Sequence, residues 1–323
     1  MKRREFVGLA GSAAVAWPLG VRAQGPRKTV RIAFVHTGVS VAEQNEKSRT
    51  MWIRTFFAEL RRLGLVEGSN AVVERHSAEG STSRYAALAA DTVGIKPDVI
   101  VANSNALISL LMKATTSIPI VGIMGDPIAD GLAANLARPG GNLTGVSIDG
   151  GPGIFAKRLQ ILREAVPATA KVAYLAGTRA EAQRSGIAVK TRLLAEVNET
   201  ELRRTFAELA QARTDAVLLS DAGSFLASRA LIIELAAKHR LPAIYTYRQF
   251  AEAGGLLAYG PELGELAKRM ALSVQQILGG TKAGDIPIYQ PTKFELVINL
   301  KTAKALGLTI PQAVLAQADE VIE

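Results

Sequence analysis

Two polar turns of this chain each follow a short apolar segment. Asn103-Ser104-Asn105 follows residues 98–102, and Gly125-Asp126-Pro127 follows residues 118–124. Serine and asparagine are favoured at the start of a helix. The free N–H groups of a helix start attract anions, and an aspartate carboxylate pairs with cations. The two turns therefore carry groups suited to holding a small polar molecule.

The segments around these turns indicate how the turns are positioned. Residues 106–114 have a helical pattern between the two apolar segments. Near-continuous apolar strands joined by a helix are typical of a parallel sheet covered on both faces. In such a sheet both turns lie at the carboxyl ends of neighbouring strands, where open α/β sheets bind ligands. The stretch therefore predicts a binding site in a doubly wound α/β domain.

The same alternation of strands and helices extends along the chain on both sides of a turn-rich segment. Gly150-Gly151-Pro152-Gly153 is that segment, and it indicates a crossover between two lobes. We expect strands at 29–35, 71–75, 143–148, 171–175, 192–197, 216–220, 243–247, 256–259 and 294–299. Helices are expected at 46–63, 81–94, 130–137, 154–165, 179–189, 199–212, 225–239, 262–278 and 301–306.

Length and composition fit a globular protein without thiol chemistry. The 323 residues are 48% hydrophobic and 21% charged, enough for two α/β domains. The chain has no cysteine. Disulfides, thiolate catalysis, iron–sulfur ligation and a lipidated N-terminal cysteine are thereby excluded.

The positive charge of the chain is partly concentrated at its start. The formal charge is +9, and residues 1–23 contribute Lys2, Arg3, Arg4 and Arg22 against Glu5, a net +3 that leaves +6. No run of Lys or Arg longer than two follows residue 23. Nucleic-acid binding needs a clustered basic face, so we expect a solvated surface and no nucleic-acid partner.

Residues 1–23 have the pattern of an export signal. A charged start precedes a moderately apolar stretch and the small-residue site that ends at Ala23. The pair Arg3-Arg4 with Phe6 resembles a twin-arginine signal. Pro18 and Gly20 argue against an amphipathic helix of the mature fold. No other segment is long and apolar enough to insert in a membrane, so we expect a soluble periplasmic protein.

Enzyme motifs are missing from the sequence. It contains no G-x-S-x-G, H-E-x-x-H or Walker A pattern. Gly279-Gly280-Thr281-Lys282 follows a predicted helix rather than a strand, so it indicates a helix stop. His36, His76 and His239 fall in different elements, and we expect neither a metal site nor a cofactor.

Six blocks of the sequence form a recognisable set. They are the leader RREFVGLAGSAAVAWPLGVRAQ, LRRLGLVEGSN (60–70), GDPIADGLAANLARPGGNLTGVS (125–147), AAKHRLPAIY (236–245), EAGGLLAYGPE (252–262) and QPTKFELVINLKTAKALGLTIP (290–311). With these blocks the chain resembles a bacterial family of ABC-transporter substrate-binding proteins with the type I periplasmic-binding fold. The resemblance runs from end to end, and together the blocks are specific.

The resemblance implies a clamshell of two doubly wound parallel-sheet α/β lobes joined by crossing hinge strands, preceded by a signal peptide. Residues 28–149 with 256–283 would form lobe 1, and 150–255 with 284–323 lobe 2. Such a protein captures a small molecule between its lobes and delivers it to a membrane permease, usually as a monomer. One branch of the family is associated with aromatic amino acids.

The resemblance also implies that ligand is bound by loops at the carboxyl ends of strands in both lobes. The expected ligand-binding residues are Thr37, Asn103, Ser104, Asn105, Gly125, Asp126, Gly177, Asp221, Ser224, Tyr245 and Tyr247. Helix starts at Ser104 and after Ser224 suit a carboxylate, either aspartate suits an ammonium, and the tyrosines suit ring stacking or hydrogen bonding.

Each of these assignments has a structural alternative. Ser104 and Asn105 either bind ligand or cap a helix, and Asp126 either binds ligand or caps the next turn. Tyr245 and Tyr247 are two residues apart along a strand and so share one face, which either faces the ligand or leaves one of the two tyrosines in the core.

Two departures from the family pattern bear on the pocket. Asn103-Ser104-Asn105 stands where the family has small residues, which predicts an altered ligand choice. Only Thr178–Lys190 separates Gly177 from the next predicted strand, a short crossover that would reshape the pocket wall.

The alternative function is an exported sensor module that presents a bound small molecule to a membrane receptor.

Overall fold

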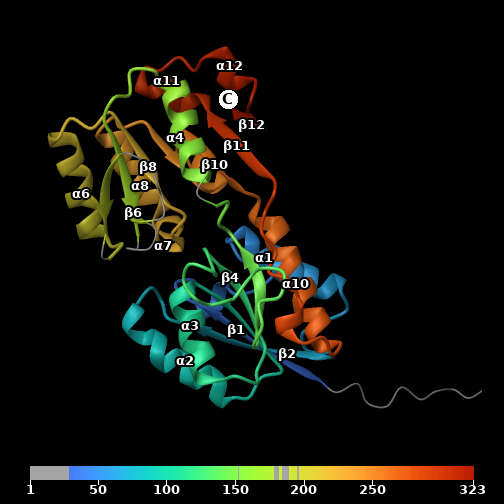
Figure 1. Cartoon of the computed structure of the whole chain (residues 1–323). Coiled ribbons are helices and arrows are strands. Elements are labelled where there is room, and N and C mark those ends of the chain that lie inside the picture. The colour runs from blue at the N-terminus through green and yellow to red at the C-terminus, as the bar shows by residue number, and fades with distance from the viewer. Residues whose placement is uncertain (1–28, 152, 178–181, 184–188, 195) are drawn as a thin grey trace, which may run out of the picture.

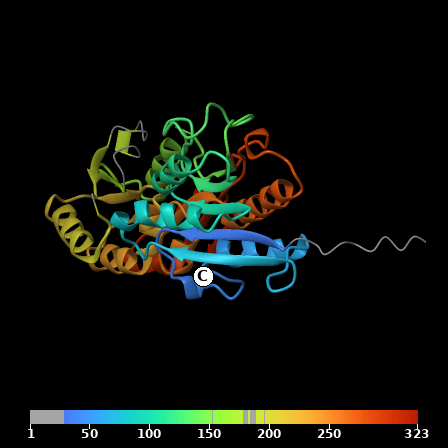
Figure 2. The same ribbon diagram turned by 90° about the horizontal axis from the view of Figure 1, so that it is seen from below.

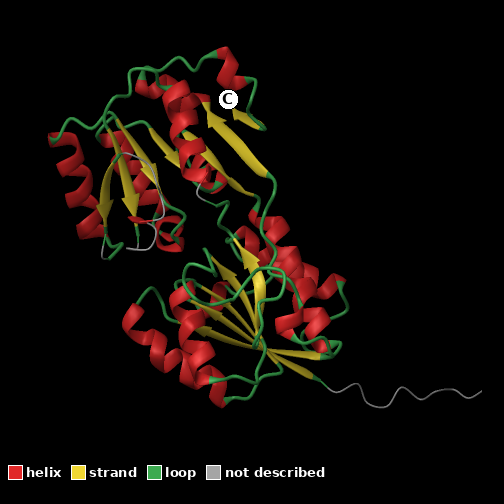
Figure 3. Cartoon of the chain, in the orientation of Figure 1, coloured by secondary structure: helices red, strands yellow, loops and turns green. Residues whose placement is uncertain are grey.

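The computed structural model describes residues 29–151, 153–177, 182–183, 189–194 and 196–323. The expected leader, residues 1–23, and most of the short crossover after Gly177 lie outside them. The chain forms two β-sheets that build the cores of two lobes (Figures 1 and 3). Within the described ranges, no helix is long and apolar enough to cross a membrane.

The first lobe contains a five-stranded parallel sheet in the order β2-β1-β3-β4-β5. Figure 2 shows β1 and β2 side by side in two shades of blue. The strands are β1 Val30–His36, β2 Ala71–Ser77, β3 Val99–Asn103, β4 Ile120–Met124 and β5 Leu143–Ser147. Its helices are α1 Met51–Arg62, α2 Tyr85–Gly94 and α3 Asn105–Ala114, joined later in the chain by α10 Leu263–Leu278. Short 3-10 turns, η1 Val41–Glu43 and η2 Thr82–Arg84, lie between them.

Strand β1 shows why this sheet is covered on both faces. Ile32 and Phe34 pack in the cluster that contains α1 and α10, whereas Ala33 and Val35 pack in the cluster that contains α2 and α3. Successive side chains of a strand point to opposite faces, so a strand of four buried apolar residues supplies two cores. On the α1 side the centroid of the Phe34 ring lies 5.9, 5.5 and 5.0 Å from those of Trp52, Phe56 and Phe57.

The second lobe contains a seven-stranded sheet in the order β12-β11-β10-β9-β8-β6-β7. Every pairing is parallel except that between β10 and β11. The strands are β6 Val172–Ala176, β7 Lys190–Leu193, β8 Ala216–Leu219, β9 Ala243–Tyr245, β10 Leu257–Pro261, β11 Phe294–Asn299 and β12 Glu320–Ile322. Its helices include α4 Gly153–Ala165, α6 Glu199–Gln211, α7 Gly223–Ala227, α8 Arg229–Lys238, α9 Arg248–Glu252, α11 Leu300–Leu306 and α12 Gln312–Leu315.

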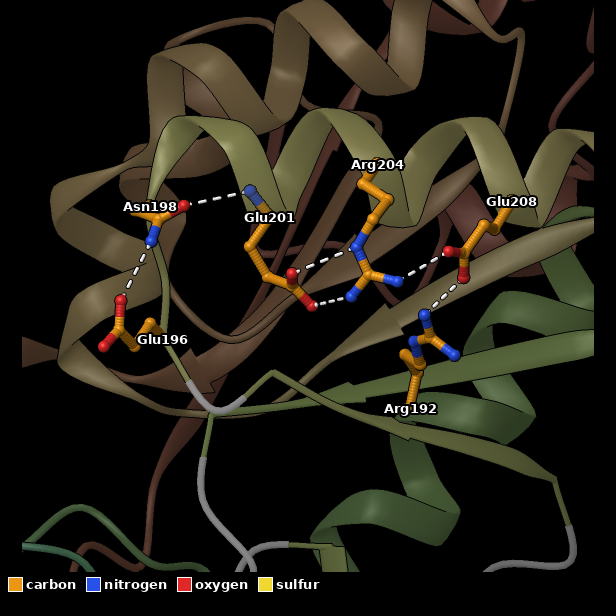
Figure 4. A network of polar contacts seen from close by, with 6 residues as sticks. All are labelled: Arg192, Glu196, Asn198, Glu201, Arg204 and Glu208. Atoms are coloured by element: carbon orange, nitrogen blue, oxygen red, sulfur yellow. Dashed lines mark hydrogen bonds and ion pairs between the residues drawn. The ribbon is translucent and has the colours of Figure 1, made fainter.

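A polar network fixes the edge of the second sheet to α6 (Figure 4). Asn198 caps α6 by accepting the Glu201 N–H at 2.9 Å. Arg204 bonds both Glu201 and Glu208, and Glu208 also pairs with Arg192 of the edge strand β7. The Arg204 hydrogen bond lowers the pKa of Glu201. The network is exposed, so it defines position more than it adds stability.

The chain passes between the two sheets three times: from β5 to α4, from β10 to α10, and from η3 (Ala283–Asp285) to β11. Near the last passage the chain is hydrogen-bonded to β5 of the first sheet. The Ser147 N–H donates to the Tyr289 carbonyl at 2.8 Å, and the Tyr289 N–H donates to the Gly145 carbonyl at 2.9 Å. Gln290 then donates to the Asp149 carbonyl at 2.9 Å, which joins two of the passages. Adjacent passages of this kind form a hinge between the lobes.

Two of the helices expected from the sequence are wrong. Residues 130–137 form turns rather than a helix, because Gly131 has φ +67° and the N–H groups of Leu132 and Ala133 both donate to the Pro127 carbonyl. The segment 225–239 is two helices, α7 and α8, divided at Ser228.

The assignment of 256–283 to the first lobe also differs from the sheets observed. Strand β10 is hydrogen-bonded between β9 and β11 of the second sheet. The helix that follows it, α10, does pack on the first lobe, against α1 and the strands β3, β4 and β5. Which sheet a strand joins depends on its distant partners, and the local sequence does not carry that information.

Candidate functional site

The loops at the carboxyl ends of the parallel strands lie where the two lobes face each other. In Figure 3 the parallel strands of each sheet run toward the other lobe. We call these loops the facing loops: residues 37–40, 104–105 and 125–130 in the first lobe, and 177, 220–224 and 246–247 in the second. They follow β1, β3, β4, β6, β8 and β9.

Asparagines hold the facing loops of the first lobe together. The Thr37 N–H donates to Asn103 Oδ1 at 2.9 Å, and Asn103 Nδ2 donates to the Thr37 hydroxyl at 2.8 Å. Asn105 Oδ1 accepts the Gly125 N–H at 2.9 Å, and its Nδ2 bonds the Asp130 carboxylate. Each amide therefore spans two strand ends, which fixes the spacing of the loops before any ligand arrives.

The start of α3 is left open by its neighbours. Ser104 occupies the N-cap position with φ +76°, and its side chain makes no capping hydrogen bond. The N–H groups of the first helical turn thus keep their capacity to bind an anion. Asn105 is likewise not a cap, since its amide bonds Gly125 and Asp130.

Asp126 performs the local role that the sequence left open. Its Oδ1 accepts the N–H groups of Ile128 and Ala129, both at 2.9 Å, which closes a turn. The second carboxylate oxygen takes no part in those bonds. The residue is half-buried, so Asp126 can hold its loop with one oxygen and present negative charge with the other.

The facing loops of the second lobe are tied by Tyr247 and Ser220. The Tyr247 hydroxyl donates to the Asp221 carbonyl at 2.7 Å, and both residues are buried. Ser220 Oγ lies 3.4 Å from the N–H groups of Gly177 and Ala222. Gly177, Asp221 and Tyr247 are therefore brought together, while Ser224 is exposed at the start of the short helix α7.

His36, at the end of β1, is a buried neutral imidazole beside the first of these loops. Its Nδ1 accepts the N–H groups of Gly38 and Val39 at 2.9 and 2.8 Å, and its ring stacks on Trp52 at 5.7 Å. Burial lowers the pKa of His36 to about 4. Because Nδ1 accepts these two hydrogen bonds, it has no room for a proton of its own, and the imidazole stays neutral. The described residues contain no group of three or more His, Asp or Glu arranged to hold a metal.

Residues 45–322 match the family model described as ABC transporter substrate binding protein. The chain belongs to this family. Its members bind solutes and are not enzymes, so the chain is the substrate-binding component of an ABC transporter. The matched range includes all the facing loops except residues 37–40.

Relatives of this substrate-binding protein include a tyrosine-binding protein of Clostridioides difficile (strain R20291), 25% identical over 269 residues, or 78% of this chain and 75% of the relative. Among solved structures, an ABC domain in complex with L-Trp from Streptococcus pneumonia superposes with a TM-score of 0.79 at 21% identity, over 91% of this chain and all of that one. A conserved domain protein from Vibrio cholerae gives 0.79 at 23% identity over the same shares. These similarities show the type I periplasmic-binding fold.

One expected residue of the substrate-binding protein lies away from the facing loops. Tyr245 is buried in the second lobe, with its ring stacked on Phe250 at a centroid distance of 4.4 Å and an interplanar angle of 8°. It lines a small pocket of about 20 Å³ with Gly254 and Gly255. Strand β9 ends at Tyr245, so Tyr247 lies beyond the strand and the two tyrosines do not share a face.

Sequence reasoning missed Arg158 of α4. Its side chain is 1% exposed, and its Nε donates to the Tyr259 carbonyl at 2.8 Å. A signal was present, because Arg158 falls on the helical stripe whose buried members also include Phe155, Leu159 and Leu162. A charged residue on an apolar stripe requires a partner.

Proposed function

We propose that this protein captures a small molecule, an amino acid or an aromatic compound, between its two lobes in the periplasm and delivers it to the permease of an ABC importer. The observation that carries the proposal is the set of polar facing loops on two lobes that three chain passages connect. Closure about such passages brings both sets of loops onto one ligand. The protein would act as a monomer.

The ligand class in this proposal is supported by relatives. One relative is named a tyrosine-binding protein, and one structure of the same fold contains L-Trp. The facing loops offer complementary groups for an amino acid. The α3 start suits a carboxylate and the free Asp126 oxygen suits an ammonium.

Residue roles follow from these groups. Asp126 would pair with the ammonium of the ligand. Thr37, Asn103 and Asn105 would donate and accept hydrogen bonds on the first lobe, with Ser104 and Gly125 as backbone contacts. On the second lobe, Gly177, Asp221, Ser224 and Tyr247 would complete the site after closure.

A thermal-shift and calorimetric screen tests the proposal. The panel contains amino acids, aromatic acids, small peptides, sugars and nucleosides, applied to protein that has been unfolded and refolded to remove bound ligand. A ligand at a hundred times its Kd stabilises the fold by about 2.7 kcal/mol, which raises Tm by several degrees. We expect an amino acid to give this shift with one site per chain.

Asp126→Asn is the informative variant, because asparagine keeps the Oδ1 acceptor for Ile128 and Ala129 while removing the charge. We expect it to retain the Tm of the parent and to lose affinity for ligands that carry an ammonium. Asp91→Asn, on an exposed position of α2, is the matched control. A panel without any hit, or an amino acid bound equally by Asp126→Asn, would count against the proposed function.

A further inference from the structure

Helix α4 buries a full positive charge directly after the first passage between the lobes. Arg158 is 1% exposed and is surrounded by apolar neighbours of its own helix, including Phe155, whose ring lies 5.5 Å below the guanidinium. Removing a guanidinium from water costs several kcal/mol unless an opposite charge and hydrogen bonds replace the water. A buried arginine of this kind therefore requires an anionic partner, either from the protein itself or from a bound molecule.

The described chain supplies Arg158 with only part of what it requires. Its Nε has the Tyr259 carbonyl, but the buried Nη1 has no hydrogen-bond partner. None of the described carboxylates forms an ion pair with it within 4.0 Å. Asp221 and Asp149 act on it only at longer range, and burial lowers the pKa of Arg158 despite them. A donor pointing at no acceptor is rare in a protein interior.

The position of this unpaired charge connects it to the ligand site. Asp221 and Tyr247 belong to the facing loops of the second lobe, and Asp149 lies on the passage from β5 to α4. Tyr259 lies in β10, just before the passage to α10. Helix α4 packs on β8 and β9, the strands that end in these loops, and the bond to the Tyr259 carbonyl holds the guanidinium beside the hinge.

We propose that the ligand carries a carboxylate and that Arg158 is its counter-charge in the second lobe, an inference that rests on the proposed function. Guanidinium and carboxylate are matched in geometry and form strong paired hydrogen bonds. Because Nη1 is covered in this form of the protein, the carboxylate reaches it when the side chains of Asp221 and Tyr247 move aside. Asp126 of the opposite lobe then faces the ammonium on the same α-carbon, and in the closed form the carboxylate pairs with Arg158 rather than with the α3 start.

Calorimetry with matched probes tests this proposal on the protein expressed with its own N-terminus. The probes are L-tyrosine, its decarboxylated analogue tyramine, and 3-(4-hydroxyphenyl)propionate, which keeps the carboxylate and lacks the amine. The variant is Arg158→Met, which removes the charge and keeps an unbranched apolar side chain. Arg163→Met, at an exposed position of the same helix, is the control.

We expect Arg158→Met to weaken L-tyrosine and the propionate about 30-fold or more, the usual result of removing one member of a buried charge pair, while Arg163→Met leaves both unchanged. Tyramine should bind the parent far more weakly than L-tyrosine. Equal affinity of parent and Arg158→Met for L-tyrosine, or equal affinity of the parent for L-tyrosine and tyramine, would overturn the proposal.

The Tm of the ligand-free protein separates this proposal from the proposed function. An unpaired charge can be replaced by an apolar side chain with little loss of stability, so Arg158→Met should keep Tm within a few degrees of the parent. A fall of more than about ten degrees would mean that Arg158 has a structural partner, which overturns the inference. If no probe binds the parent, the amino-acid ligand of the proposed function is wrong. The Tm comparison then still shows whether Arg158 has a structural partner within the protein.

Discussion

Acidification should destabilise this protein through His36, and the size of the effect can be worked out from its surroundings. Folded His36 has a pKa of about 4, because burial disfavours the imidazolium. In the unfolded chain the pKa is about 6.5. The unfolded state therefore binds a proton first as the pH falls, and stability decreases as the pH falls from about 6.5 to about 4.

The expected loss is about 2 kcal/mol at pH 5 and roughly 3 kcal/mol at pH 4 relative to pH 7.5. Other groups titrate in the same range, so a variant that removes only the titration is required. His36→Asn is suitable, because its Oδ1 can accept the N–H groups of Gly38 and Val39 that the His36 Nδ1 accepts.

Urea unfolding of the parent and His36→Asn from pH 7.5 to pH 4 measures the difference. We expect the two curves of unfolding free energy against pH to diverge below pH 6.5, the parent losing about 2 kcal/mol more by pH 5. Parallel curves would refute the account of His36 as a buried neutral acceptor.

Two further substitutions test the fold. Gly145→Ala should lower the unfolding free energy by about 3 kcal/mol or more. The reason is that Gly145 has φ +136° and that a Cβ there would overlap the Gly122 carbonyl oxygen of the neighbouring strand. The control Gly38→Ala, which has open space around it, should change the unfolding free energy little. Asn198→Ala should cost about 1 kcal/mol through the lost N-cap of α6, and Asn198→Asp should restore it. Urea midpoints measure both effects. A Gly145→Ala midpoint equal to that of the parent would contradict the close strand packing, and an Asn198→Asp midpoint as low as that of Asn198→Ala would contradict the N-cap.

The sequence predicted elements well where the signal is local. Strand β4, expected at 118–124, is Ile120–Met124, and α6, expected at 199–212, is Glu199–Gln211. Continuous apolar runs and 3.6-residue periodicity report burial directly. The missed case, 130–137, is rich in Ala and Leu, but hydrogen bonds to the Pro127 carbonyl and the left-handed Gly131 replace the helix.

The position of the candidate site is more predictable than its detail. Asn103, Asn105 and Asp126 follow apolar strands in the sequence, and the structure places them at the ends of β3 and β4. Their hydrogen-bond partners depend on which strands are neighbours, and that information is not local. The resemblance places Tyr245 among the loops at the carboxyl ends of the strands, whereas in the structure Tyr245 is the last residue of β9 and is buried. Arg158 was overlooked because arginine on a helix is usually exposed.

The most direct test of capture between two lobes is small-angle X-ray scattering of the protein, unfolded and refolded to remove ligand, during titration with the amino acid found in the screen. Closure about the three passages predicts a radius of gyration that decreases with occupancy and reaches a plateau at one ligand per chain. Full occupancy, measured by calorimetry on the same sample, with an unchanged scattering curve would contradict the account.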